Sequence, residues 1–207
     1  MEIILKLSES HKFLGLTIDT LNWSSHMNII SNKLNSACYA IRRTIQLINT
    51  TTAKTVYFAY FESLMKYGII CWGNSHFTEK IFKIQKKAIR ILGRLNNQHS
   101  CRNYFFKFKI LTVYSIYILE ILLYTHKTKS KSTKINHSHN TRHKDFIPIQ
   151  TDNTTKFESS IKFSGQKLYN KIPEQWKNIQ SFNSFKKTVK QYLLKSVVYK
   201  IEDFNPS

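Results

Sequence analysis

Residues 80–94 (KIFKIQKKAIRILGR) combine basic and apolar side chains at helical spacing. At about 100° per residue, five basic residues fall within one arc of about 80°. They are Lys80, Lys83, Lys87, Arg90 and Arg94. A neighbouring arc of similar width holds Ile81, Ile84, Ala88, Ile91 and Leu92. The spacing predicts an amphipathic helix whose apolar side packs on other helices while its basic side faces outward.

A basic helix face is often no more than a solvated surface. Solvated faces usually alternate Glu with Lys, because such pairs stabilise a helix. Here Glu79 is the only acidic residue, and it stands at the N-terminal end. The pattern therefore favours a surface that binds an anion. We add Lys86 of the same helix, with Arg42 and Arg43 of an earlier one, to the predicted nucleic-acid-binding residues.

The composition agrees with an anionic partner without proving one. The 207 residues include 32 Lys and Arg against 12 Asp and Glu, a formal net charge of +20. Nucleic acid and anionic lipid are the polyanions that such a chain attracts. A second explanation is codon choice in a genome rich in A and T, because Lys outnumbers Arg 26 to 6. A hydrophobic content of 42% is enough for a core, so we expect a folded protein.

Two more helices are predicted before residue 80. Apolar residues recur every three or four positions over 27–48 and again over 56–65. The polar residues 49–52 break the pattern and can cap the second helix, which should end near Gly68. Upstream, residues 12–19 (KFLGLTID) alternate weakly and are rich in β-formers, which predicts a short strand or hairpin.

The second half predicts further helices and a basic loop. Residues 101–109 form a short helix, and residues 112–126 are apolar nearly all round, which is typical of a buried helix. That apolar run contains Glu120 and is shorter than the ~20 residues that cross a bilayer, so no membrane partner is expected. A helix lying on the membrane surface is also disfavoured, because the apolar side of residues 80–94 is needed for packing. Residues 127–144 are basic and almost free of apolar side chains, which predicts a flexible loop.

A small α(+β) unit should close the chain. We expect a short strand at 146–149, a helix at 163–171 that ends before Pro173, and an amphipathic helix at 184–196. The predicted fold class is mainly α, and its four parts follow the chain. They are a hairpin (1–25), a helical bundle (26–126), a basic linker (127–145) and a C-terminal unit (146–207).

Reactive side chains are sparse. The four Asp residues are scattered, so no acidic cluster is predicted to hold Mg²⁺. His137, His139 and His143 could ligate zinc, but they have no Cys pair at a fixed spacing, and metal binding is the less favoured interpretation. We predict neither a catalytic residue nor a metal ligand.

Three cysteines bear on the cellular compartment. Cys38, Cys71 and Cys101 form no CxxC pair, so reduced thiols are expected rather than a disulfide framework. The first ten residues lack the pattern of a signal peptide. These features favour a cytoplasmic or nuclear protein over a secreted one.

Several strings resemble, in order, one family of polymerases. They are KFLGLTID (12–19), NWSSH (22–26), KLNSACYAIRR (33–43), YFAYFESLMKYGIICWGN (57–74), IFKIQKKAIRIL (81–92), SCRNYFFKFKIL (100–111), SGQKLYNKIPEQWK (164–177) and SFKKTVKQYLL (184–194). Together they resemble the C-terminal part of the reverse transcriptases of non-LTR (LINE-type, jockey-like) retrotransposons. The resemblance covers about residues 10–200.

The resemblance implies a role for each segment. Residues 12–19 would form the primer-grip hairpin, with Phe13, Leu14 and Gly15 as primer-grip-like residues. The three helices up to residue 94 would be the thumb, which lies along a primer–template duplex. The implied partners are RNA and DNA, as an RNA–DNA hybrid or the element's own RNA.

The family's catalytic palm is missing from this sequence. Its Tyr/Phe-Ala-Asp-Asp motif and an earlier Asp lie upstream of the grip, and Met1 falls just before the grip. We therefore expect no polymerase activity from this chain alone and no cofactor, since Mg²⁺ would belong to the palm. Two functions remain open. One is a catalytically incomplete fragment that keeps a nucleic-acid surface, and the other is a helical module that binds or inhibits a full-length reverse transcriptase.

Overall fold

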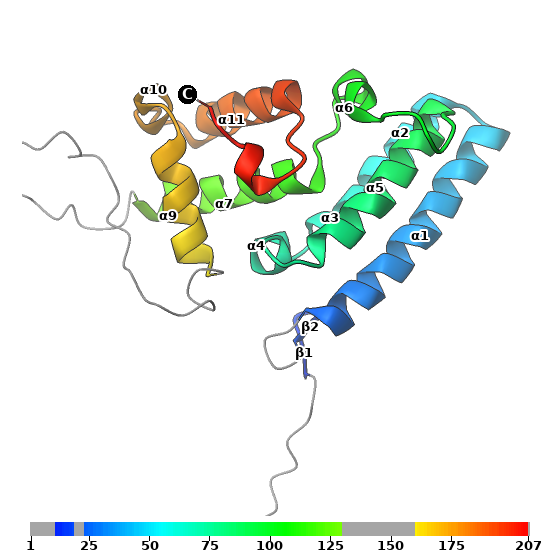
Figure 1. Cartoon of the computed structure of the whole chain (residues 1–207), viewed down its shortest axis with the longest axis horizontal. Coiled ribbons are helices and arrows are strands. Elements are labelled where there is room, and N and C mark those ends of the chain that lie inside the picture. The colour runs from blue at the N-terminus through cyan, green and yellow to red at the C-terminus, as the bar shows by residue number, and fades with distance from the viewer. Residues whose placement is uncertain (1–10, 19–22, 130–159, 207) are drawn as a thin grey trace, which may run out of the picture. The chain divides into compact units, whose positions relative to one another are not determined.

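The computed structural model of the chain describes residues 11–18, 23–129 and 160–206. These residues are mainly helical, with a short two-stranded hairpin near the N-terminus (Figure 1), which confirms the predicted fold class. Contacts divide the chain into two compact units. Of the described residues, the first comprises 11–18, 23–68 and 75–101, and the second comprises 69–74, 102–129 and 160–206.

The hairpin belongs to the first unit. Strands β1 (His11–Phe13) and β2 (Leu16–Ile18) pair antiparallel, with His11 opposite Ile18. The two turn residues, Leu14 and Gly15, both have positive φ, at 46° and 79°. This is the backbone of the tight turns that match the twist of a two-residue hairpin, and Gly15 adopts it without steric cost.

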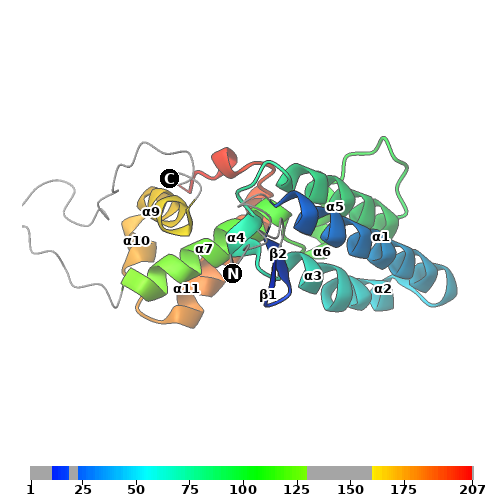
Figure 2. The same ribbon diagram turned by 90° about the horizontal axis from the view of Figure 1, so that it is seen from below.

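Three helical segments complete the first unit, and α1 packs along α5 (Figure 2). Their elements are α1 (Ser24–Leu47), α2 (Thr50–Val56), η1 (Tyr57–Glu62), α3 (Ser63–Lys66) and α5 (Thr78–Gly93). Asn49 caps α2 by accepting a hydrogen bond from the Thr52 N–H at 2.8 Å, as the predicted break implied. The middle segment, η1, is a π-helix that joins α2 to α3 without a turn.

The buried face of α5 differs from the predicted one. Ile81, Ala88 and Leu92 are buried as expected, but Ile84 and Ile91 are only half-buried. Their places in the core are taken by Phe82, Gln85 and Ile89. The helix is therefore rotated relative to the prediction, and it packs on α1 and α2, as expected.

This rotation carries the amide side chain of Gln85 into the core of the unit. Its Nε2 donates to the Tyr57 hydroxyl at 2.9 Å, and both side chains are 0% exposed. The sequence prediction did not include Gln85 among the buried residues of this helix. A buried amide needs a hydrogen-bond partner, and here that partner comes from another helix.

The second unit is built around α7, which contacts α4, α9 and α11 (Figure 1). Its elements are α4 (Ile69–Trp72), α6 (Arg102–Phe108), α7 (Val113–Lys129), α9 (Ile161–Lys171), α10 (Glu174–Lys177), α11 (Phe182–Ser196) and η2 (Ile201–Asp203). The expected all-round burial of α7 is confirmed over residues 116–119 and 121–123, which are each at most 6% exposed. Ser160 and Ser181 cap α9 and α11 with their hydroxyl groups.

Two predicted boundaries are changed by the structure. The basic loop was expected from residue 127, but α7 continues through residue 129. The bundle was expected to include residues 102–126, yet these residues lie in the second unit. Long-range bonds hold them there, such as the 2.6 Å hydrogen bond from the Thr112 hydroxyl to the Val198 carbonyl.

Three expectations fall on residues that the structure does not describe. They are the remainder of the loop (130–144), the strand at 146–149 and the histidine cluster of His137, His139 and His143. Within the described ranges, none of the helices has the length and apolar character needed to cross a membrane.

Candidate nucleic-acid interface

The basic residues of α5 meet asparagines of α1 at a regular spacing. Lys80 Nζ lies 2.9 Å from Asn28 Oδ1, and Lys87 Nζ lies 3.3 Å from Asn35 Oδ1. Both pairs are separated by 52 positions in the chain. The two helices therefore run in the same direction, and one step of seven residues, about 10.5 Å, leads from one pair to the next on each helix.

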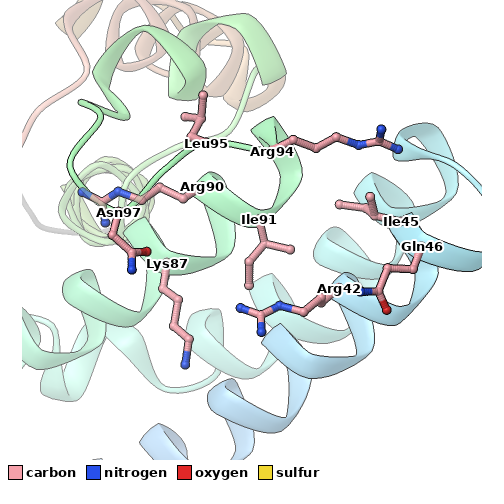
Figure 3. Close-up of a pocket in the computed structure, with 9 residues that line it drawn as sticks. All are labelled: Arg42, Ile45, Gln46, Lys87, Arg90, Ile91, Arg94, Leu95 and Asn97. Atoms are coloured by element: carbon pink, nitrogen blue, oxygen red, sulfur yellow. The ribbon is translucent and has the colours of Figure 1, made fainter.

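A further seven residues along the sequence lead to Arg42 on α1 and to Arg94, which lies just beyond the end of α5. Arg42 on α1 and Arg94 after α5 line a common hollow with Lys87 and Arg90 (Figure 3). The hollow has a cavity volume of about 880 Å³. Its other described lining residues are Ile45, Gln46, Ile91, Leu95 and Asn97. None of these nine residues is acidic, so the hollow is a concentration of positive charge.

Arg94 reaches the hollow from a left-handed backbone. Helix α5 ends at Gly93, and Arg94 caps it with φ 51° and ψ 43°. Its N–H bonds to the carbonyl groups of Arg90 and Ile91. The sequence analysis aligned Arg94 with Lys80 by assuming helical geometry through residue 94. Arg94 is a capping residue with a left-handed backbone, so that assumption does not hold for it. A non-glycine residue in this conformation costs about 1 kcal/mol or more.

Arg90 is held in place by the loop that follows α5. Its Nε donates to the carbonyl oxygen of His99 at 3.2 Å, which fixes one edge of the guanidinium group. The buried thiols of the unit lie within the field of these cations. Burial raises the pKa of Cys38 to about 11, while Lys87 and Arg42 act in the opposite direction. Burial likewise raises the pKa of Cys101 against the lowering effect of Arg90 and Lys86.

The other predicted basic residues have different surroundings. Lys83 pairs with Glu79 at 2.9 Å on an exposed turn of α5, and such pairs contribute little to stability. Lys86 places its ammonium 4.7 Å from the centroid of the Phe82 ring, in a cation–π contact. Arg43 donates to Gln46 Oε1 at 3.4 Å. None of these three is among the described residues that line the hollow.

The three residues that the resemblance implied to be primer-grip-like lie at the tip of the hairpin. Phe13 and Leu14 are exposed, at 64% and 73%. The Tyr67 hydroxyl donates to the Leu14 carbonyl, and the ring of Tyr67 lies beside Gly15. The contacts of the tip are therefore with the corner that follows α3.

The sequence missed the partners from α1. Asn28 and Asn35 are seven residues apart on one helix, as Lys80 and Lys87 are on another, and that matching interval was the available signal. Gln46 and Asn97 carried no such signal. Over the described ranges, no group of three or more His, Cys, Asp or Glu side chains could hold a metal ion.

The comparisons with known proteins add no relative. No protein-family model matches the sequence, and no match was found among curated proteins or solved structures.

Proposed function

We propose that the surface formed by α1 and α5 binds the phosphate backbone of nucleic acid, with an RNA–DNA hybrid as the partner. The observation that supports this most strongly is that Arg42, Lys87, Arg90 and Arg94 all line one hollow whose described lining has no acid. Like charges held together raise the free energy of the folded chain, and phosphate groups would offset that cost.

The Asn–Lys pairs suit this partner. An amide oxygen orients an ammonium group without neutralising it, so Lys80 and Lys87 keep their full charge. On α1, the positions of Asn28, Asn35 and Arg42 are spaced by about 10.5 Å and span about 21 Å, or roughly six base-pair steps of a duplex. Contacts of this kind carry little sequence information, so the binding we propose is general and sensitive to salt.

The resemblance to non-LTR reverse transcriptases supports the choice of hybrid. In that interpretation the first unit is a thumb with its grip hairpin, acting in the cytoplasm or nucleus. No chemistry is proposed for the chain itself. Its role is to hold a primer–template duplex for a palm that this sequence does not contain.

A fluorescence-anisotropy titration tests the proposal. The labelled probe is a short RNA–DNA hybrid, and the proteins are the full chain and the variant Arg42→Gln/Lys87→Gln. We expect the variant to bind about tenfold or more weakly, a loss of about 1.4 kcal/mol. The control Lys187→Gln/Lys190→Gln removes the same charge from an exposed face of α11 and should bind nearly as the unchanged chain does. Equal losses in both variants would refute the assignment to α1 and α5.

A further inference from the structure

The hollow between α1 and the end of α5 has a lining that a nucleic-acid backbone does not require. Beside its four cations it presents three aliphatic side chains, Ile45, Ile91 and Leu95. Figure 3 shows Ile91 between Arg42 and the end of α5, with Arg90 and Arg94 directed to either side. Aliphatic carbon offers nothing to a phosphate group, but it suits the flat face of a base.

The size of the hollow also favours a ligand larger than a phosphate group. Its volume of about 880 Å³ lies within the range of roughly 300–1,000 Å³ that small-molecule sites occupy. A phosphate group alone would leave most of this space to water. A phosphate with its nucleoside would use both the basic and the apolar lining. Gln46 and Asn97 add amide groups that can donate to or accept from a base edge.

The amount of charge favours the end of a strand over its interior. An internal phosphodiester carries one negative charge, whereas a terminal phosphomonoester carries about −1.5 to −2 near neutral pH. Four cationic residues line this one hollow. Two of them are arginines from different segments, Arg42 and Arg94, whose planar groups can each present paired donors to a tetrahedral anion.

We propose that this hollow holds the terminal phosphomonoester of a nucleic-acid strand together with its nucleoside. Arg42 and Arg94 take the phosphate, and Ile91 and Leu95 lie against the base. The inference rests on the proposed function, because the strand behind that end is held by the Lys80 and Lys87 positions of the same surface.

Anisotropy with short RNA strands of one sequence tests the proposal. One strand carries a 5′-phosphate, one carries a 3′-phosphate, one has hydroxyl groups at both ends, and a circular form has no end. The full chain should bind at least one phosphorylated strand about tenfold or more tightly than the circle, equivalent to about 1.4 kcal/mol. The preference should vanish in Arg42→Gln/Arg94→Gln and persist in the control Lys187→Gln/Lys190→Gln. Circular dichroism should show the same helix content in all three proteins.

The possible outcomes distinguish the strand-end site from the proposed binding of the nucleic-acid backbone. Equal affinity for phosphorylated, hydroxyl-ended and circular strands overturns the end site and leaves the proposed backbone binding intact. A preference that survives in Arg42→Gln/Arg94→Gln overturns it as well. Failure to bind any strand or the hybrid overturns the proposed function itself. Binding of free adenosine monophosphate, with no preference for a phosphorylated strand, assigns the hollow to a free nucleotide and contradicts the strand-end proposal.

Discussion

The ammonium nitrogen of Lys87 lies 3.3 Å from the amide oxygen of Asn35, one seven-residue step along both helices from the Lys80–Asn28 contact at 2.9 Å. The acceptors on α1 are neutral amides where carboxylates would have given ion pairs. The lysines are thus oriented from α5 toward α1 while their charge stays available. Both pairs are exposed, so their value is in placement more than in stability.

This arrangement predicts the effect of adding acid without touching a lysine. Asn28→Asp/Asn35→Asp would pair both lysines with carboxylates and should weaken hybrid binding about tenfold. Stability should change by no more than about 1 kcal/mol, because the new pairs are solvated. Anisotropy and urea unfolding measure the two effects. The control Asn103→Asp/Asn183→Asp adds the same charge in the second unit, and an equal loss of affinity there would show that net charge alone matters.

Arg94 predicts a trade between stability and binding. Arg94→Gly removes the cost of a left-handed arginine, about 1–2 kcal/mol, but makes the unfolded chain more flexible by about 0.4–1 kcal/mol. The folded state should gain roughly 0.5–1 kcal/mol while hybrid affinity falls. Lys109 also has a positive φ, at 56°, after α6. Lys109→Gly should therefore stabilise similarly and leave affinity unchanged. A loss of stability in Arg94→Gly would contradict this interpretation.

The Tyr57–Gln85 hydrogen bond should be important for the first unit. Tyr57→Phe leaves the buried Nε2 of Gln85 without its hydroxyl acceptor, which should cost about 1–3 kcal/mol. Tyr60→Phe is the matched control, since that ring lies on the same π-helix and is 41% exposed. Its effect should stay within about 0.5 kcal/mol. Urea unfolding measures both, and equal effects would show that the buried bond contributes nothing.

His26 should make stability depend on pH. Its Nδ1 accepts the Thr17 N–H at 3.3 Å, and its Nε2 has no partner among the described residues. Burial lowers the pKa of His26 below its ordinary value of 6.5, and Lys33 acts in the same direction. The unfolded chain therefore takes up the proton more readily than the folded one. The stability due to neutral His26 is fully present above about pH 6.5 and is lost as the pH falls below it.

Urea unfolding at about pH 7.5 and pH 5.5, on either side of the ordinary histidine pKa, checks this expectation. The fall in stability should be smaller in His26→Gln than in the unchanged chain. His76→Gln, at an exposed histidine, should keep the full fall. An identical fall in all three proteins would assign the pH dependence to other groups.

Local signals predicted most of the helices. Periodicity located α1, α5 and α11, and the side chain of Asn49 marked the start of α2 as expected. Such signals depend on neighbours in the chain, so one sequence is enough to find them. They did not predict that α5 would turn Gln85 inward, because its partner Tyr57 is 28 residues away.

The candidate site was predictable only in part. Helical spacing identified Lys87 and Arg90, but the register between α1 and α5 is set by packing between the two helices. That register decides that Arg42 joins the hollow while Arg43 turns to Gln46. The assignment of residues 102–126 to the second unit depends on contacts with residues near 198. No local sequence pattern predicts these long-range contacts.

The salt dependence of hybrid binding tests the central claim most directly. Affinity is measured for the full chain and for Lys80→Gln/Lys87→Gln between about 50 and 200 mM salt. If both lysines contact phosphates, the logarithm of the binding constant should fall steeply with the logarithm of salt. The slope should become shallower by about 0.9 for each lysine removed. A slope that is unchanged in the variant, or flat in the full chain, would contradict a phosphate-binding surface on α1 and α5.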